Sequence, residues 1–93
     1  MLRITEIRKP GKDATLHLEG EVMGAWVMEV KKACERFVGK GYGLTLDLGD
    51  VEYVDRDGVA LLGELMNHQV RLVNCSSFLA EQLRGNSHQR QSS

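Results

Sequence analysis

The residues of this sequence that could do chemistry gather in one acidic stretch after an apolar run. The stretch holds the carboxylates Asp47, Asp50, Glu52, Asp55 and Asp57. Paired carboxylates can act as general acid and base or hold a divalent ion. No pairing of a nucleophilic side chain with a histidine stands near them, and solvated turns commonly collect acids. We therefore expect no enzymatic activity and no catalytic residue.

The histidines and cysteines do not follow a metal-binding pattern. His17, His68 and His88 are scattered, and neither Cys34 nor Cys75 has a second cysteine close by. Structural metal sites usually show paired ligands at short, regular spacing. We expect no metal and no cofactor. Both cysteines fall inside apolar patterns, so we expect two small buried hydrophobic residues.

Length and charge restrict the class of protein. The chain has 93 residues, enough for one small domain, and 12 Lys and Arg against 13 Asp and Glu give a formal net charge of -1. A protein that binds phosphate backbones usually carries a clear positive excess, so we expect no nucleic-acid partner. The apolar runs are far shorter than the roughly 20 residues of a membrane span. No signal-like segment begins the chain, and we expect a cytoplasmic protein without direct membrane insertion.

The elements that must position the acidic stretch follow from hydrophobic periodicity. Apolar residues recur every three or four positions in residues 21–38, which predicts an amphipathic helix with Trp26 packed on the sheet. A serine often caps a helix, so we expect Ser77 to begin the last one. The expected order is strand, strand, helix, strand, helix, strand and helix, over residues 1–7, 14–20, 21–38, 44–48, 57–66, 70–73 and 77–84.

This order predicts an α/β fold in two layers. Strand-helix-strand units need right-handed crossovers between parallel strands, so the first strand alone runs antiparallel. Leu16 and Leu18 alternate with polar residues, which is typical of a sheet with one open face. We expect a four-stranded mixed sheet with helices mainly on one face. Residues 1–85 would form one domain and residues 86–93 a polar flexible tail.

Three segments make the chain resemble a STAS domain, the module of anti-sigma factor antagonists. They are "LEGEV" at residues 18–22, "LTLDLGDVEYVDRDGVALL" at 44–62 and "VRLVNCSSFLAEQL" at 70–83. The resemblance covers nearly the whole chain. It implies a non-enzymatic module that docks on partner proteins, often serine kinases that also restrain sigma factors, with binding controlled by phosphorylation.

The chain departs from this family at the motif that gives the resemblance. The family motif reads Asp-Ser-Ser-Gly or Asp-Ser-Thr-Gly, and its second hydroxyl residue accepts phosphate. Here the turn reads Asp55-Arg56-Asp57-Gly58, so neither replaced position can be phosphorylated by a serine kinase. Asp57 could imitate a phosphorylated serine, stabilise the start of a helix, or contact a partner directly. We expect these four residues at the centre of the partner surface.

Two other functions are compatible with the resemblance. Some small STAS proteins that lack the serine pair dock on an ABC-type ATPase for lipid transport, which would make this chain a transporter accessory subunit. Related modules also bind nucleotides or other small molecules, although no phosphate-cradling sequence supports that here. The second helix is shorter than in many relatives, with only "GELMNHQ" between Leu62 and Val70, and this should alter which partner fits.

Overall fold

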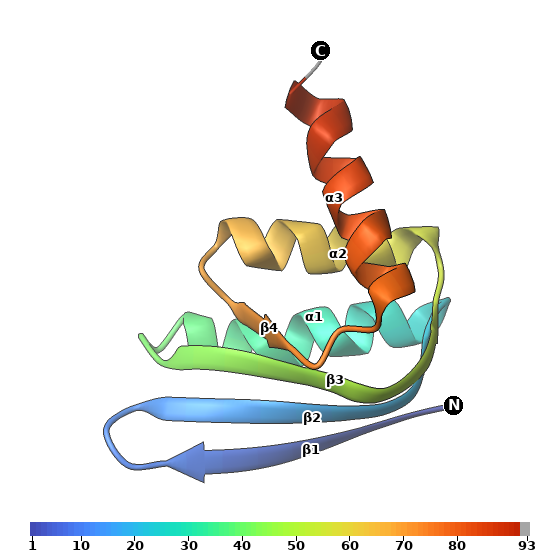
Figure 1. The fold of residues 1–93 in the computed structure, drawn as a ribbon. Coiled ribbons are helices and arrows are strands. Elements are labelled where there is room, and N and C mark those ends of the chain that lie inside the picture. The colour runs from blue at the N-terminus through green and yellow to red at the C-terminus, as the bar shows by residue number, and fades with distance from the viewer. Residues whose placement is uncertain (92–93) are drawn as a thin grey trace.

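A four-stranded sheet, covered on one face by two helices, organises the chain (Figure 1). The computed structural model describes the backbone of residues 1–91 and the side chains of residues 1–84. The elements are β1 (Leu2–Lys9), β2 (Asp13–Val22), α1 (Ala25–Val38), β3 (Gly43–Val54), α2 (Arg56–Asn67), β4 (Arg71–Val73) and α3 (Ser77–Gln91). None of the helices in the described part of the chain is long and apolar enough to cross a membrane.

The sheet has the strand order β1-β2-β3-β4. β1 pairs with β2 antiparallel, whereas β2 with β3 and β3 with β4 pair parallel. Each parallel pair needs a long connection across the sheet, and α1 and α2 supply the two connections. The predicted mixed sheet, with only its first strand antiparallel and helices mainly on one face, is confirmed.

Alternation along the two central strands places the core between the sheet and the helices. Leu16, Leu18 and Leu46 are completely buried and meet Val30 from α1 and Leu62 from α2, which are also completely buried. The alternate residues turn to the other side and are half-buried: Thr15, His17, Glu19, Thr45 and Asp47. The second face of the sheet is therefore open and polar, as expected from the sequence.

The first helix begins later than predicted, at Ala25 instead of Glu21. Val22 is completely buried and pairs with Val54 at the end of the parallel ladder, so this segment extends β2. The chain turns into α1 through Gly24, whose φ of 57° suits glycine. β3 is likewise longer than expected, because it continues through Val54 instead of ending at Leu48.

The predicted packing of Trp26 onto the sheet is wrong. The buried residues of α1 are Val30, Ala33, Cys34 and Phe37, whereas the Trp26 side chain lies in the first turn and is 39% exposed. In the first turn of α1 it is Val27, next to Trp26, that is half-buried and packs against the core.

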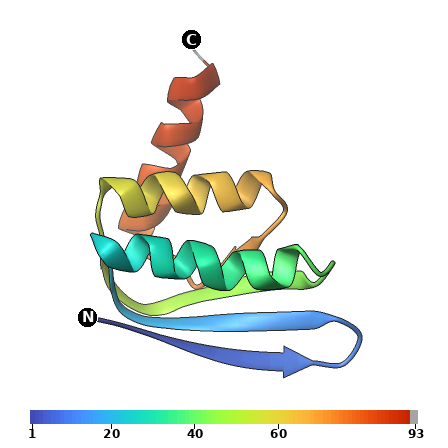
Figure 2. The same cartoon turned by 180° about the vertical axis from the view of Figure 1, so that it is seen from behind.

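The last helix differs from the prediction at both ends. The Ser76 hydroxyl, rather than that of Ser77, accepts a hydrogen bond from the Leu79 amide at 3.1 Å and caps α3. The helix then continues to Gln91, beyond the expected end at Arg84, and points away from the two-layer body (Figures 1 and 2). Residues 92–93 of the expected tail lie outside the described residues, and the flexibility of residues 86–93 stays a prediction.

Candidate functional site

The predicted partner site lies directly after β3 and consists of the N-cap and the first turn of α2. Asp55 is the N-cap of α2, with extended backbone dihedral angles, and its Oδ1 accepts a hydrogen bond from the Gly58 amide at 2.7 Å. The first amides of a helix have no partner within the helix, and a short side-chain acceptor satisfies one of them. This local interaction explains why the helix begins directly after the acidic residue.

The Asp55 carboxylate also connects the two helices that cover the sheet. Its Oδ2 accepts a hydrogen bond from the amide of Gly24, the residue before α1, at 2.9 Å. The Asp55 amide donates to the Val22 carbonyl at 3.1 Å. The amides of Gly24 and then Gly58 lower the pKa of Asp55, because both hydrogen bonds favour its charged form. One ionised side chain thus joins the starts of α1 and α2.

Gly58 is required by close packing. A Cβ atom built on Gly58 would lie 2.6 Å from Val54 Cγ1 and 2.7 Å from the Val22 carbonyl oxygen. These distances are far below van der Waals contact, and the second involves backbone that cannot swing aside. The first turn of α2 can approach the ends of β2 and β3 only without a side chain at this position.

Within the described part of the chain, the side chains of Arg56 and Asp57 have no such structural contacts. Both side chains are exposed, and no hydrogen bond or ion pair joins either of them to another residue whose side chain the structure describes. Asp57 lies in the first turn of α2, where the helix dipole favours negative charge. Because Asp55 performs the capping, the Asp57 carboxylate is available at the surface.

Asp57 stands at the border of a surface hollow between α1 and α2, which we call the α1–α2 hollow. Its volume is about 490 Å³. Its lining residues are Val27, Met28, Lys31, Asp57, Ala60, Leu61 and Glu64. Met28 is 51% exposed, so apolar surface is accessible beside charged groups of both signs. A hollow with this composition can accept an apolar side chain of another protein and orient it by charge.

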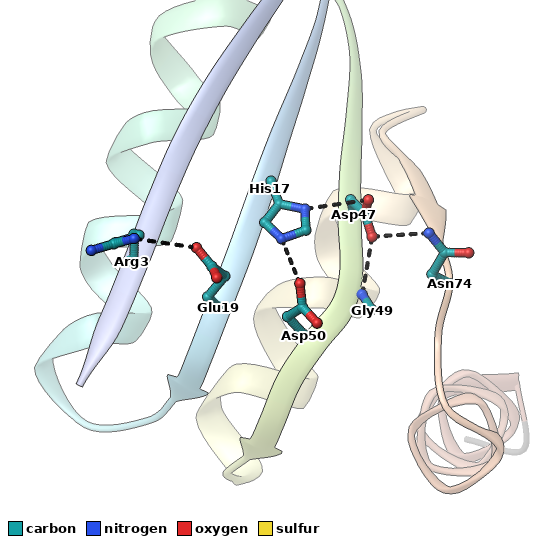
Figure 3. A network of polar contacts seen from close by, with 7 residues as sticks. All are labelled: Arg3, His17, Glu19, Asp47, Gly49, Asp50 and Asn74. Atoms are coloured by element: carbon teal, nitrogen blue, oxygen red, sulfur yellow. Dashed lines mark hydrogen bonds and ion pairs between the residues drawn. The ribbon is translucent and has the colours of Figure 1, made fainter.

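A second group of polar residues, which sequence reasoning missed, occupies the open face of the sheet (Figure 3). His17 on β2 contacts two carboxylates of β3, through Nδ1 to Asp47 Oδ2 at 3.3 Å and through Nε2 to Asp50 Oδ2 at 2.8 Å. Asp47 Oδ1 accepts hydrogen bonds from the Gly49 amide and from Asn74 Nδ2, both at 3.0 Å.

A bulge in β3 brings the two aspartates to the same face. His17 pairs with Asp47 and Glu19 pairs with Asp50, so two residues of β3 oppose the single residue between His17 and Glu19 on β2. In a regular strand, residues three apart point to opposite faces, and the extra residue reverses this. The glycine inside the strand pattern, Gly49, is the signal that could have indicated the bulge.

The contacts shift the acidity of the groups on this face. The hydrogen bond with Asp50 raises the pKa of His17, the contact with Asp47 adds to this, and desolvation opposes both. The hydrogen bonds from Asn74 and then Gly49 lower the pKa of Asp47. The imidazole is thus stabilised in its charged form between two carboxylates.

The comparisons with known proteins agree with this architecture. The family model described as "STAS domain" matches residues 5–85. The solved structure described as "Structure of the Anti-Sigma Factor Antagonist SpoIIAA in its Unphosphorylated Form" is similar with a TM-score of 0.72 and 15% identity, over 85% of this chain and 79% of that chain.

A second solved structure, described as "Crystal Structure Analysis of Mglu", is similar with a TM-score of 0.63 and 20% identity. The similarity covers 75% of this chain but 19% of that one. No curated protein matches the chain. At these identities the two structural similarities establish the fold.

Proposed function

The chain belongs to the STAS domain family, and we propose that it is a non-enzymatic regulatory module that acts by reversible binding to a partner protein. One observation carries the proposal: the exposed Asp57 beside the α1–α2 hollow, on a turn that the Asp55 hydrogen bonds hold in place. A preorganised surface loses little entropy when it binds. The partner class that we propose is an anti-sigma factor or a related serine kinase-like regulator.

The charge of Asp57 would replace the phosphorylation switch. A phosphoserine carries about -1.5 to -2 charges at neutral pH, whereas a carboxylate carries a constant single charge. Asp57 occupies the position at which, by resemblance, other family members accept phosphate. Its side chain is exposed and is not used for capping, so its charge can act on a partner. The module would therefore stay in one state that a serine kinase cannot change.

The surroundings of Asp57 define which partner surface would fit. The apolar residues that line the α1–α2 hollow, including Val27 and Leu61, suit an aliphatic or aromatic anchor. Asp57 and Glu64 at the border favour a basic group beside that anchor, while Lys31 on the opposite helix favours an acidic one. A partner surface with an apolar anchor between a basic and an acidic group would therefore bind across α1 and α2.

The test is affinity capture from native lysate with four baits: wild type, Asp57→Asn, Asp57→Ser and Asp13→Asn. Asp57→Asn removes the charge with almost no change in shape, and Asp57→Ser restores an acceptor for phosphate. Asp13 is exposed at the opposite end of the sheet and serves as the matched control. Bound proteins and phosphate on each bait are identified by mass spectrometry, and dissociation constants are then measured with the purified partner.

We expect a kinase-like partner whose affinity changes at least about 10-fold, or about 1.4 kcal/mol, in Asp57→Asn but not in Asp13→Asn. We also expect phosphate on the serine bait alone. Equal affinity of all four baits would contradict the location of the surface. Capture of a transporter ATPase would contradict the proposed partner class and indicate a transporter accessory subunit. A heat signal on titration with nucleotides would favour a ligand sensor.

A further inference from the structure

The open face of the sheet, which the proposed function does not use, brings together three side chains that can ligate a metal ion. His17, Glu19 and Asp50 each offer one ligand atom, and these atoms all lie within 4.8 Å of one another. The exposed fractions of the three side chains are 26%, 41% and 61%, so an ion can reach them from solvent. Figure 3 shows the three residues on one face of β2 and β3.

Two features of the backbone bring these ligands together. His17 and Glu19 are two residues apart on β2, so strand alternation turns both to the open face. Asp50 reaches that face because the bulge in β3 shifts its register by one residue. Without the bulge Asp50 would point toward the helices, and only two of the three ligands would remain together.

The imidazole of His17 is held in an orientation that suits metal binding. Its Nδ1 faces Asp47 Oδ2 at 3.3 Å, and Asp47 is itself fixed by the Gly49 amide and by Asn74. A histidine that binds a metal almost always donates its other ring N–H to a carboxylate, a backbone carbonyl or a water, which fixes the tautomer. The same contact leaves Nε2 directed at Asp50 and Glu19.

The distances leave room for an ion after a small adjustment. His17 Nε2 lies 2.8 Å from Asp50 Oδ2, whereas two ligands of a tetrahedral zinc ion with bonds of about 2.0 to 2.1 Å are roughly 3.3 Å apart. The carboxylate of Asp50 is exposed and can rotate by this amount. Glu19 is longer and can approach from the same strand.

The local charge also favours a cation with two positive charges. Glu19, Asp47 and Asp50 are three carboxylates on one patch, and the described cation beside them, Arg3, is 4.0 Å from Glu19. A metal ion bound at Nε2 displaces a proton to solvent and leaves the imidazole neutral. Two negative charges of the patch are then uncompensated, and a divalent ion neutralises them.

We propose that His17, Glu19 and Asp50 form a binding site for a divalent transition-metal ion of the zinc class, with Asp47 as the positioning residue for His17. One nitrogen and two carboxylate oxygens suit zinc and leave a fourth position for water. The proposal differs from the sequence-based expectation of no metal, because the three ligands come together only through the β2–β3 register.

The test is calorimetric titration of the full chain with ZnCl₂, together with the visible absorption of the protein in CoCl₂. The variants are His17→Gln, Asp50→Asn, Glu19→Gln and Asp47→Asn, and circular dichroism checks that each is folded. His68→Gln is the matched histidine control, because His68 is exposed in the turn after α2. Cys75→Ser is the control for binding by the half-buried thiol.

We expect one zinc ion per chain, and cobalt bands typical of low coordination number. Each ligand variant should weaken zinc binding by more than about 10-fold, and Asp47→Asn should weaken it by roughly 10 to 100-fold. The two control variants should bind like wild type. Asp50→Asn is the most informative variant, because the exposed side chain can be changed without disturbing the core.

Three results would overturn the proposal. The first is no binding of zinc up to millimolar concentration. This would mean that His17 only forms hydrogen bonds and ion pairs with the two aspartates. The second is binding that is unchanged in His17→Gln and Asp50→Asn. The third is binding that is lost in Cys75→Ser or His68→Gln, which would assign the ion to those side chains instead.

Discussion

The four residues of the Asp55-Arg56-Asp57-Gly58 turn divide into two pairs with different roles. Asp55 and Gly58 hold the turn, the first by two hydrogen bonds and the second by the absence of a side chain. Arg56 and Asp57 point to solvent and are available to a partner. A substitution in the first pair should therefore change stability, whereas one in the second pair should change binding.

The stability contributed by Asp55 should depend on pH. Its pKa in the folded chain is lowered by the amides of Gly24 and Gly58, relative to an unfolded value of about 3.9. The contribution is therefore fully present above the unfolded pKa and is lost as the pH falls through the lower folded pKa. Asp55→Asn keeps a shape that can accept one of the two bonds but carries no charge. It should be less stable than wild type at pH 7.

This difference between wild type and Asp55→Asn should shrink as the pH falls below about 4. Urea unfolding at several pH values from neutral to acidic measures this stability difference. The contributions of other acidic residues cancel in it, because these residues titrate equally in both proteins. A stability difference that stays constant over this whole range would show that the charge of Asp55 does not contribute.

Gly58→Ala should destabilise the protein although alanine is the better helix former. Helix propensity alone predicts a gain of roughly 1 kcal/mol. The added methyl group would meet Val54 Cγ1 and the Val22 carbonyl oxygen at distances below 3 Å, and such overpacking costs about 1 to 3 kcal/mol. We expect a net loss in the free energy of unfolding, measured with urea.

Gly43→Ala is the control for this substitution. A methyl group there would meet Asp13 Oδ1 at an ordinary 3.5 Å, and the backbone has no positive φ. Its effect should be clearly smaller than that of Gly58→Ala. An alanine variant at Gly58 as stable as wild type would disprove the close-packing explanation.

At the level of elements, β3 has the largest influence on both polar sites. Its carboxyl end delivers Asp55 to the start of α2, and its bulge delivers Asp50 to the open face. The leucines of β3 pack against the helices and fix the position of the strand. Its acidic residues then contribute to the two sites at the surface. A change of one residue in its register would separate His17 from its carboxylate partners.

The last helix should depend on two leucines for its packing. Leu79 and Leu83 are 5% and 7% exposed, whereas Phe78 beside them is 72% exposed. Leu79→Ala and Leu83→Ala should each destabilise the protein by about 2 to 5 kcal/mol, because each leaves a cavity in the core. Phe78→Ala should change stability by less than about 0.5 kcal/mol.

Thermal and urea unfolding of the three variants decide this point. Equal losses in Phe78→Ala and Leu79→Ala would mean that α3 packs through a different face from the one described. Loss of partner binding in Phe78→Ala, with stability unchanged, would instead extend the partner surface to the start of α3.

The molecule carries its two proposed binding surfaces on opposite sides of one sheet. The helix layer formed by α1 and α2 (Figure 1) carries the residues that line the α1–α2 hollow, Asp57 among them. His17 and its carboxylates lie on the uncovered face (Figure 3). The core between them is a single cluster with buried residues from every described element except β4, whose half-buried Leu72 packs against it. The two sites can therefore be tested independently by exposed substitutions.

The thiol of Cys34 should report on the opening of this core. Cys34 is completely buried, and burial raises the pKa of its thiol to about 12. The thiolate is the reactive form of cysteine and is therefore scarce in the folded protein at pH 8, so reagent reaches Cys34 after unfolding. In a Cys75→Ser background, Ellman's reagent should react with Cys34 more slowly under conditions that stabilise the folded protein. The reaction should become faster as urea is added.

Cys75 provides the comparison, because its side chain is half-buried instead of fully buried, although desolvation raises the pKa of its thiol too. In a Cys34→Ser background, Cys75 should react faster than Cys34 does. Faster reaction of Cys34, without dependence on urea, would show that the space between α1 and α2 opens locally.

The sequence by itself determined the order of the elements, the antiparallel first strand, the open face of the sheet, and the resemblance that the family match later confirmed. These features depend on local periodicity and on the handedness of crossovers, which nearby residues encode. It also indicated the Asp55-Arg56-Asp57-Gly58 turn, although not which of its acids caps the helix.

Only the tertiary structure decided which distant groups meet. Asp55 binds the amide of Gly24, 31 residues away, and His17 meets Asp50, 33 residues away. Both contacts depend on the register between β2 and β3, and a bulge of one residue determines the second. Register is a property of paired strands and moves whole sets of side chains between faces, so the spacing of residues along one strand could not reveal it.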